Sequence, residues 1–335
     1  MPEQRAASLN RITIDVYVDE KGMLRSMPEE VRVGLSASPK RLSPKYFYDE
    51  AGSILFEKIT ELPEYYPTRA ERDLLQQVSA DLMANLRPQQ IVELGSGSSY
   101  KTRLLLSAPT AHEYLESYVP FDVSESIVRE AAHQLTTEYP DLIVHGVVGD
   151  FGRDLLHIPA ATGPRLVLFL GGTIGNMDSQ ERIFLLRQIS ELLREEDCLL
   201  IGMDLLKDIE IIEAAYNDSA GVTAAFNRNM LHVLNRTLGS DFRPDAFEHR
   251  CFFNEAESRI EMHLVPQSPQ IVSLAALGMS VTFTPADSLW TESSYKFTEE
   301  SISIMLAGAG LFMEHFYTNK DPKRLFGLAL VRTLG

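Results

Sequence analysis

Residues able to bind a nucleoside lie directly after three short apolar segments of the sequence. They are Gly95 and Gly97 after the first segment, Asp122 after the second, and Asp150 with Phe151 after the third. Glycines let a ligand approach the backbone and leave amide donors free, and a carboxylate can accept hydrogen bonds from both hydroxyls of a ribose. These residue types at these positions predict an adenosine-binding site.

The glycine turn has the pattern Glu93-x-Gly95-x-Gly97 and lacks a third glycine three residues later. Because the full dinucleotide fingerprint is absent, hydride transfer with a nicotinamide is the weaker interpretation. A glycine turn alone can simply join a strand to a helix. Together with the two aspartates in register, it is typical of the nucleoside site of Rossmann-like methyltransferases that use S-adenosylmethionine.

A parallel sheet would bring these positions to one edge. Seven apolar segments predict its strands, at residues 90–94, 115–121, 143–148, 165–170, 197–203, 311–318 and 325–332. Helical spacing of apolar residues occurs at 69–86, 101–106, 181–194 and 299–309. Fully apolar strands that alternate with helices indicate a sheet covered on both faces, with ligands bound beyond the carboxyl ends of its strands. We therefore expect an α/β fold of the Rossmann-like class I type, with seven mostly parallel strands, one of the last two antiparallel.

Two segments lie outside the predicted sheet. The chain leaves the sheet after residue 203 and returns near residue 296, and the first 68 residues also precede it. We expect residues 69–206 and 296–335 to form the methyltransferase domain. Residues 1–68 and 207–295 should form a smaller α+β cap, in which the substrate is held away from water.

The composition restricts the partners. The 335 residues include 47 Asp plus Glu and 31 Lys plus Arg, a net charge of −16 that repels phosphate backbones and anionic lipid. Cys198 and Cys251 lack metal-ligand spacing and form no disulfide framework, and residues 1–10 lack a signal-peptide core. We expect a cytoplasmic monomer that binds no nucleic acid, membrane or metal.

Six segments resemble the histidine-specific N-alpha-methyltransferase family of ergothioneine biosynthesis. They are Phe47 to Asp49, Leu62 to Arg69, Val92 to Gly97, Gly175 with Asn176, Ala220 to Asn229, and Glu292 to Phe297. The second and fifth are long and lie outside the generic sheet, so they favour this family over methyltransferases in general. The resemblance covers nearly the whole chain. It implies transfer of three methyl groups from S-adenosylmethionine to the alpha-amino group of L-histidine, which gives hercynine.

The resemblance also implies the substrate contacts, at Tyr48, Phe56, Asn176, Tyr216, Met262, Glu292 and Ser294. Asn176 would hold the amine and the carboxylate, because its amide can both donate and accept. Tyr48 and Tyr216 would bind the carboxylate end without adding a charge. Glu292 and Ser294 would hold the imidazole, so selectivity for histidine would depend on them.

The cofactor contacts implied in the same way are Tyr65, Gly95, Gly97, Lys101, Asp122, Asp150 and Phe151. Lys101 could reach the methionine carboxylate, and Tyr65 would touch the methionine end. Tyr48, Tyr65 and Asn176 are the expected catalytic residues, with a tyrosine or a water that it holds as the proton acceptor. Tyr100 departs from the family, which often has an acidic residue there.

Two alternatives remain open. A relative could methylate another amino acid such as tryptophan, although a carboxylate with a hydroxyl suits imidazole better than indole, which has one donor and no acceptor. The chain could also be a catalytically silent module that binds S-adenosylmethionine. Because every expected cofactor and substrate position is filled, an enzyme is favoured.

Overall fold

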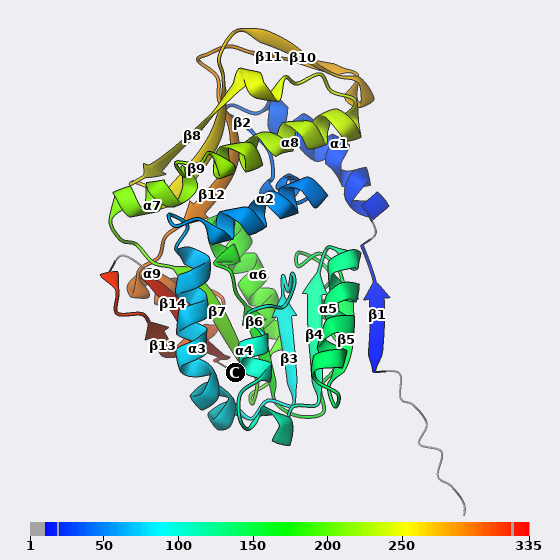
Figure 1. The fold of residues 1–335 in the computed structure, drawn as a ribbon, viewed down its shortest axis with the longest axis vertical. Coiled ribbons are helices and arrows are strands. Elements are labelled where there is room, and N and C mark those ends of the chain that lie inside the picture. The colour runs from blue at the N-terminus through cyan, green and yellow to red at the C-terminus, as the bar shows by residue number, and fades with distance from the viewer. Residues whose placement is uncertain (1–10, 19, 323–324, 335) are drawn as a thin grey trace, which may run out of the picture.

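The protein has two parts, described by a computed structural model for residues 11–18, 20–322 and 325–334. Figure 1 shows a large sheet with flanking helices below and a smaller cap of strands and helices above. Residues 1–10, which the sequence analysis considered for a signal peptide, lie outside the described residues.

The large sheet contains eight strands in the order β1-β5-β4-β3-β6-β7-β14-β13. Their bounds are β1 Ile12–Val16, β3 Gln90–Leu94, β4 Ser117–Asp122, β5 Ile143–Val148, β6 Arg165–Phe169, β7 Cys198–Asp204, β13 Leu311–Thr318 and β14 Phe326–Thr333. β14 runs antiparallel to β7 and β13, and the other pairs are parallel. All seven predicted strands are present, so the Rossmann-like, mostly parallel sheet is confirmed.

The eighth strand, β1, corrects the sequence analysis, which places residues 1–68 outside the sheet. β1 pairs in parallel with β5, with Ile14 beside Gly146. The missing side chain of Gly146 makes room for this pairing, since a Cβ there would lie 2.6 Å from Ile14 Cδ1. β1 is an edge strand whose side chains are at most half-buried. It therefore lacks the continuous apolar run that identifies the central strands.

Helices cover both faces of the large sheet. α3 (Pro67–Leu86), α4 (Arg103–Leu106) and α5 (Glu125–Glu138) pack on one face, and α6 (Ser179–Leu192) and α9 (Glu299–Ala307) pack on the other. Local sequence sets where these helices begin. α3 has a proline in its first turn, and α6 begins at a capping box of Asp178 and Glu181. The predicted helices are confirmed, although the one expected at 101–106 is a single turn.

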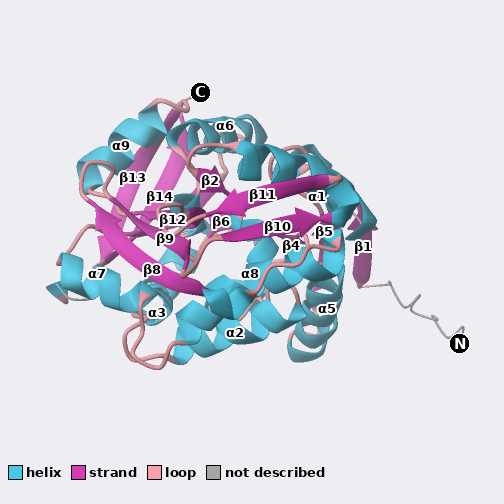
Figure 2. Cartoon of the chain, turned by 90° about the horizontal axis from the view of Figure 1, so that it is seen from above, coloured by secondary structure: helices cyan, strands magenta, loops and turns pink. Residues whose placement is uncertain are grey.

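The cap combines a small sheet, a hairpin and four helices. Its sheet has the order β2-β12-β9-β8, and β10 pairs with β11. The bounds are β2 Lys40–Arg41, β8 Phe247–Asn254, β9 Arg259–Pro266, β10 Gln270–Leu274, β11 Met279–Phe283, β12 Leu289–Tyr295, α1 Glu20–Ser36, α2 Glu50–Glu61, α7 Ile209–Tyr216 and α8 Val222–Leu238. Figure 2 looks down on this cap, with helices around its strands.

The two cap segments share one apolar core although they are far apart in sequence. Phe47 of the first segment packs against Phe226 of the second, with ring centroids 4.6 Å apart. Asn229 on α8 donates to Asp49 Oδ1 at the start of α2, at 2.7 Å. Figure 1 shows α2 and α8 side by side above the carboxyl ends of β3 and β4. The cap therefore lies over the edge where the sequence predicts ligand binding.

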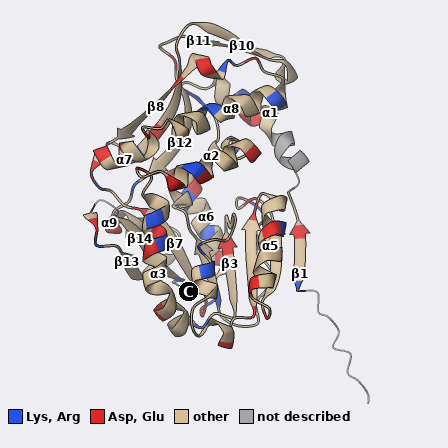
Figure 3. Cartoon of the chain, viewed as in Figure 1, with Lys and Arg blue, Asp and Glu red and all other residues tan. Residues whose placement is uncertain are grey.

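Charge is distributed over both parts. Figure 3 shows acidic and basic residues interspersed on the helices of the cap and of the large sheet. None of the helices within residues 11–18, 20–322 and 325–334 has the length and apolar character needed to cross a bilayer.

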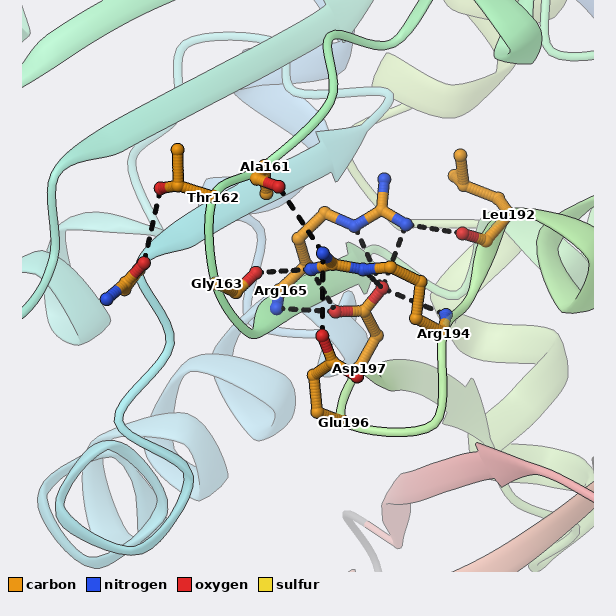
Figure 4. Close-up of polar contacts among 9 residues, drawn as sticks. Ala161, Thr162, Gly163, Arg165, Leu192, Arg194, Glu196 and Asp197 are labelled. Carbon is orange, nitrogen blue, oxygen red and sulfur yellow. Dashed lines mark hydrogen bonds and ion pairs between the residues drawn. The ribbon is translucent and has the colours of Figure 1, made fainter.

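A buried ionic cluster fixes the end of the sheet that lies away from the cap. Asp197, which is fully buried, accepts from the backbone N of Arg165 at 2.8 Å and from its Nε at 2.9 Å. Arg194 donates to the same carboxylate through its backbone N and its guanidinium (Figure 4). Burial alone would raise the pKa of Asp197, but these hydrogen bonds outweigh it and lower the pKa. The cluster joins the starts of β6 and β7.

We predict that Asp197→Ala destabilises the protein by about 3–5 kcal/mol, because it leaves the buried Arg165 without its counter-charge. Urea unfolding at pH 7 measures the change. Glu196→Ala is the matched control, since Glu196 is half-exposed and its 3.4 Å pair with Arg194 should contribute less than about 1 kcal/mol.

The lowered pKa of Asp197 means that its contribution to stability is present at neutral pH and lost in acid. The difference between wild type and variant should therefore shrink below about pH 4. Equal effects of the two variants would contradict the assignment.

Candidate functional site

The glycine turn after β3 has the backbone geometry that a nucleoside site requires. Gly95 and Gly97 have φ of 69° and 49°, a conformation that favours glycine. A Cβ on Gly97 would meet nothing within 4 Å, so open space adjoins the turn. The Ser96 hydroxyl between them is buried and has no hydrogen-bond partner among the described residues. The backbone N–H groups of Gly95 and Ser96 donate to Phe121 O, and that of Gly97 donates to Asp122, so the amide donors expected to be free are used within the protein. What the turn offers beside open space is the Ser96 hydroxyl.

Asp122, at the end of β4, faces this turn. Its Oδ2 accepts from Gly97 N and its Oδ1 accepts from Ser124 N, both at 3.0 Å. Burial raises its pKa, and the backbone hydrogen bonds oppose that rise. Each oxygen uses one backbone donor and retains acceptor capacity. The structure thus brings together Gly95, Gly97 and Asp122 as the sequence predicts.

The other two predicted nucleoside residues follow β5. The ring of Phe151 lies 5.9 Å from those of Phe121 and Phe169, and its edge would be 3.5 Å from a Cβ on Gly95. Asp150 Oδ1 accepts from Gly152 N at 2.8 Å, which shapes the loop. Phe151 therefore provides an apolar surface beside the glycine turn, as an adenine ring would need.

A buried glutamate, Glu93, supports the turn, and the sequence analysis missed this role. Glu93 is buried and accepts short hydrogen bonds from Thr102 Oγ1 and Tyr118 Oη. Burial raises its pKa to about 7, against the lowering effect of these two bonds. The sequence analysis names Glu93 only as part of the glycine-turn motif and assigns it no structural role. Its contact with Thr102 connects the end of β3 to the segment after the glycine turn.

Lys101 is paired in the structure. Its ammonium forms an ion pair with Glu71 of α3, whose carboxylate also accepts from Gly171 N at 2.8 Å. Glu71 is buried against Gly202 of β7, where a Cβ would lie 2.0 Å from its Oε1. Lys101 therefore lies at the carboxyl edge of the sheet, and its contact with a methionine carboxylate remains a prediction.

A cavity lies between α2, the loop before α3, α7, α8 and the cap sheet. Its lining contains six residues that the sequence analysis assigns to substrate or cofactor: Tyr48, Phe56, Tyr65, Tyr216, Met262 and Glu292. It also contains Ile59, Ala215, Thr223 and Phe226, which that analysis did not assign. Thr223 and Phe226 lie in the family-like segment 220–229, and this resemblance is the sequence signal that could have identified them as lining residues.

Aromatic rings form one wall of the cavity. Tyr48 stands edge-on to Phe56 and to Phe226, each at 5.6 Å between ring centroids. Tyr65 stands edge-on to Phe56 at 6.3 Å and to Tyr216 at 6.1 Å. Burial raises the pKa of Tyr65 and of Tyr216 well above 10, so both phenols stay protonated at neutral pH. The wall presents ring faces and uncharged hydroxyls.

A β-bulge in β12 directs two polar side chains toward the core of the cap. Leu289 pairs with Leu264 and Glu292 pairs with Met262, so one extra residue, Thr291, lies between them. Cross-strand partners share a face, and Leu264 and Met262 lie two residues apart on β9. Strict alternation would put Leu289 and Glu292 on opposite faces. The bulge instead places both on the side of Met262, and Ser294 follows on that side.

Glu292 lines the cavity without a hydrogen bond to its carboxylate among the residues that the structure describes. Burial raises its pKa to about 7, and the charge of Lys296 opposes that rise. Glu292 is half-buried, and a carboxylate that is largely removed from water without a donor is unfavourable unless a ligand supplies one. The geometry therefore fits a ligand that brings an N–H to Glu292.

Ser294 is buried beside Glu292 on the strand and contacts Tyr216 and Lys296. Tyr216 Oη donates to Ser294 Oγ at 2.8 Å, and Lys296 Nζ donates to the same oxygen at 2.9 Å. The predicted role of Tyr216 at a carboxylate end differs from this contact, because its hydroxyl proton is already donated to Ser294. Tyr216 lines the cavity, whereas the buried Ser294 is not one of its lining residues and contacts the lining residue Tyr216.

Asp204 joins this pocket to the large sheet. It is the last residue of β7, and it pairs with Lys296 at 2.8 Å and with Lys207 at 2.5 Å. Tyr66 at the start of α3 also donates to it, at 2.8 Å. Burial raises the pKa of Asp204, but the two lysines outweigh burial and lower it. Sequence reasoning assigned no role to Asp204, Lys207 or Lys296, although Lys296 lies in the family-like segment Glu292 to Phe297.

Asn176 does not line the cavity. It ends the turn Thr173–Asn176 after β6, which packs against β12. A Cβ on the neighbouring Gly175 would lie 3.0 Å from Tyr295 O and 3.6 Å from Ser294 Oγ. Asn176 is therefore close to the substrate strand, and its predicted contact with the amine remains a prediction. Within the described part of the chain, no group of three or more His, Cys, Asp or Glu residues could hold a metal ion.

Comparison with known proteins shows the family of the chain. The family model described as "Histidine-specific methyltransferase, SAM-dependent" matches residues 27–333. The chain is 46% identical to the histidine N-alpha-methyltransferase of Mycolicibacterium smegmatis, over 94% of this chain and 97% of that protein. It is 42% identical to the protein of that name from Mycobacterium tuberculosis, over 96% and 99%. The ergothioneine biosynthesis protein 1 of Schizosaccharomyces pombe is 29% identical, over 82% of this chain and 36% of that protein. The resemblance inferred from sequence motifs is thus confirmed, and the chain belongs to the family of histidine-specific, S-adenosylmethionine-dependent methyltransferases.

Proposed function

We propose that the protein transfers methyl groups from S-adenosylmethionine to the alpha-amino group of L-histidine, three times in succession, and so produces hercynine for ergothioneine biosynthesis. The observation that carries this proposal is a Glu292 carboxylate without a hydrogen bond among the described residues, in a cavity walled by aromatic rings, where the lining residue Tyr216 is bonded to the Ser294 hydroxyl. Family membership and the names of the mycobacterial relatives support the same substrate.

We propose that the part with the large sheet binds the cofactor and the cap binds the substrate. S-adenosylmethionine fits the residues present, because the buried Ser96 hydroxyl lacks a partner among the described residues and open space adjoins Gly97. Asp122 would accept from the ribose hydroxyls, and Phe151 would lie against the adenine. Lys101 would reach the methionine carboxylate, and Asp150 would shape the adenine loop.

In the cap, each end of histidine would meet groups of suitable character. Glu292 would accept the ring N–H, and Ser294 would contact the other ring nitrogen. Met262 and Phe56 would pack against the ring, while Asn176 and Tyr48 would bind the amine and the carboxylate. Because Tyr216 already donates to Ser294, we propose that it supports the ring end.

The chemistry requires a neutral amine whose lone pair points at a methyl group. The cofactor, when bound, supplies that methyl on a sulfonium, so positioning provides most of the acceleration. The raised pKa of Tyr65 excludes a phenolate at neutral pH. We propose that Tyr65 and Tyr48 orient the amine through neutral hydroxyl oxygens while water takes each released proton. The trimethylated product carries a fixed positive charge, which the rings of Tyr48, Phe56 and Phe226 would shelter.

The cofactor assignment predicts that Asp122→Ala weakens binding of S-adenosylhomocysteine. Two ribose hydroxyls lose a charged acceptor, and such a bond contributes about 1.5–3 kcal/mol, so affinity should fall roughly ten- to a hundredfold. Titration calorimetry measures this affinity. Glu125→Ala removes a nearby exposed carboxylate that pairs only with Arg129, and it should leave the affinity unchanged. Equal affinity of wild type and Asp122→Ala would refute the assignment.

The role of Asn176 predicts a different pattern. Asn176→Ala should abolish detectable methylation and leave S-adenosylhomocysteine affinity near normal, because only the substrate end is changed. Mass spectrometry of a turnover mixture and calorimetry give the two readings. Loss of both would indicate that Asn176 supports the fold of the turn instead.

Selectivity for the ring predicts the effect of Glu292→Ala. An imidazole N–H buried without its acceptor costs about 1–3 kcal/mol, so kcat/KM for histidine should fall roughly ten- to a hundredfold. Tryptophan should lose nothing, since its side chain no longer meets a carboxylate that must be desolvated. The histidine-to-tryptophan ratio of kcat/KM should therefore fall. Ser293→Ala, one residue along on the opposite face, is the control, and an unchanged ratio in Glu292→Ala would place selectivity elsewhere.

A further inference from the structure

The hydrogen bonds around Lys296 determine which groups can still donate inside the pocket. The Lys296 ammonium has three N–H groups, and three acceptors surround it: Asp204 Oδ2 at 2.8 Å, Ser294 Oγ at 2.9 Å and Tyr216 Oη at 3.1 Å. Its side chain is fully buried. All of its donors are therefore used within the protein, and it can act on a ligand only through these neighbours.

Ser294 is the neighbour whose behaviour this arrangement decides. A serine hydroxyl has two acceptor sites and one proton to donate. Tyr216 donates into one acceptor site of Ser294 and Lys296 donates into the other. Both acceptor sites are filled, so the only interaction left to Ser294 is to donate its proton. Glu292 has the opposite polarity, since an ionised carboxylate can only accept.

We propose that Lys296 is a positioning residue that makes the pocket select an uncharged ring with one N–H and one acceptor nitrogen. This inference rests on the proposed function, in which Glu292 and Ser294 hold the imidazole. A neutral imidazole satisfies both groups, with its N–H on Glu292 and its lone pair facing Ser294. An imidazolium has two N–H groups, and the second would meet the proton of Ser294. An indole has no lone pair to offer Ser294.

Other ionisable groups also face this pair, and among the described residues only Tyr216 and Lys296 donate to Ser294. Asp204, Tyr48, Tyr65, Tyr216 and Cys251 interact electrostatically with Glu292 or Lys296. Burial raises the pKa of Cys251 to about 12 and the pKa values of Tyr65 and Tyr216 well above 10, so these groups stay neutral. The lowered pKa of Asp204 keeps it ionised beside Lys296. Burial lowers the pKa of Lys207, which pairs with Asp204, to about 8 and raises the pKa of Glu292 to about 7. Near neutral pH, the groups that change charge are therefore Glu292, Lys207 and the ring of the substrate.

The test compares L-histidine with L-1,2,4-triazol-3-ylalanine, whose ring has an N–H and acceptor nitrogens but stays neutral over the assay range. Both substrates share the alpha-amine and both need Glu292, so the ratio of their kcat/KM values isolates the charge of the ring. The ordinary imidazole pKa is about 6.5, so in the wild type the ratio should fall about tenfold from about pH 7.5 to about pH 5.5. The change should lie in the KM for histidine.

In Lys296→Met, one acceptor site of Ser294 is free for an imidazolium N–H, so the ratio should change less than about twofold over this range. Lys207→Met is the matched control. It removes the other lysine from Asp204, with the same change in charge, but leaves the contacts of Ser294 intact. Its ratio should follow the wild type. If the pH dependence of the kcat/KM ratio were lost in both variants, or in neither, the proposal would be overturned.

Further measurements distinguish misfolding of Lys296→Met from failure of the proposed function. S-adenosylhomocysteine affinity and the unfolding midpoint show whether Lys296→Met folds. If it does not fold, Ser294→Ala tests the same polarity, because removing the donor hydroxyl should also flatten the ratio, and a wild-type profile in that variant would refute the inference. If the wild type methylates no histidine, the proposed function fails first. Histidine turnover with an unaltered profile in Lys296→Met would overturn only the role of Lys296.

Discussion

The buried carboxylate of Asp204 is the constraint on which the two parts of the molecule depend. It ends β7 inside the protein, where an unpaired charge would be strongly unfavourable. Lys207 lies just beyond it, and Lys296 comes from the point where the chain returns from the cap. The ion pair therefore fixes the two passages between the sheet and the cap that flank residues 207–295. Because Lys296 also contacts Ser294 and Tyr216, the geometry of the pocket is coupled to the end of a central strand.

Much of the sheet could be predicted because its strands are buried on both faces. Every residue of Gln90–Leu94 and Arg165–Phe169 is buried, and most of these residues are apolar. The functional positions Gly95, Gly97 and Asp122 follow directly, since parallel strands bring their carboxyl ends to one edge. The edge strand β1 could not be found in this way. It has one neighbour and half-exposed side chains, so its pattern does not differ from that of a loop.

The substrate pocket was less accessible to sequence reasoning for a different reason. Motif resemblance indicated Tyr48, Met262 and Glu292, and the structure brings these residues to one cavity. Periodicity would have put Leu289 and Glu292 on opposite faces, and only the register with β9 shows the bulge that turns Glu292 inward. Lys296 was invisible as a site residue because a lysine is normally exposed. Long-range pairing, rather than local preference, decides where both side chains lie.

The interleaving of the cap with the sheet constrains how the chain can fold during synthesis. Asp49 at the start of α2 receives its hydrogen bond from Asn229, which is 180 residues later in the chain. β1 must wait for β5, and β7 gains its outer neighbour only when β14 is made. Domains usually fold as units in order of synthesis, but here the first cap segment leaves the ribosome long before its partners. We therefore expect slow folding governed by distant contacts, with the apolar side of α2 exposed to chaperones until the second cap segment emerges.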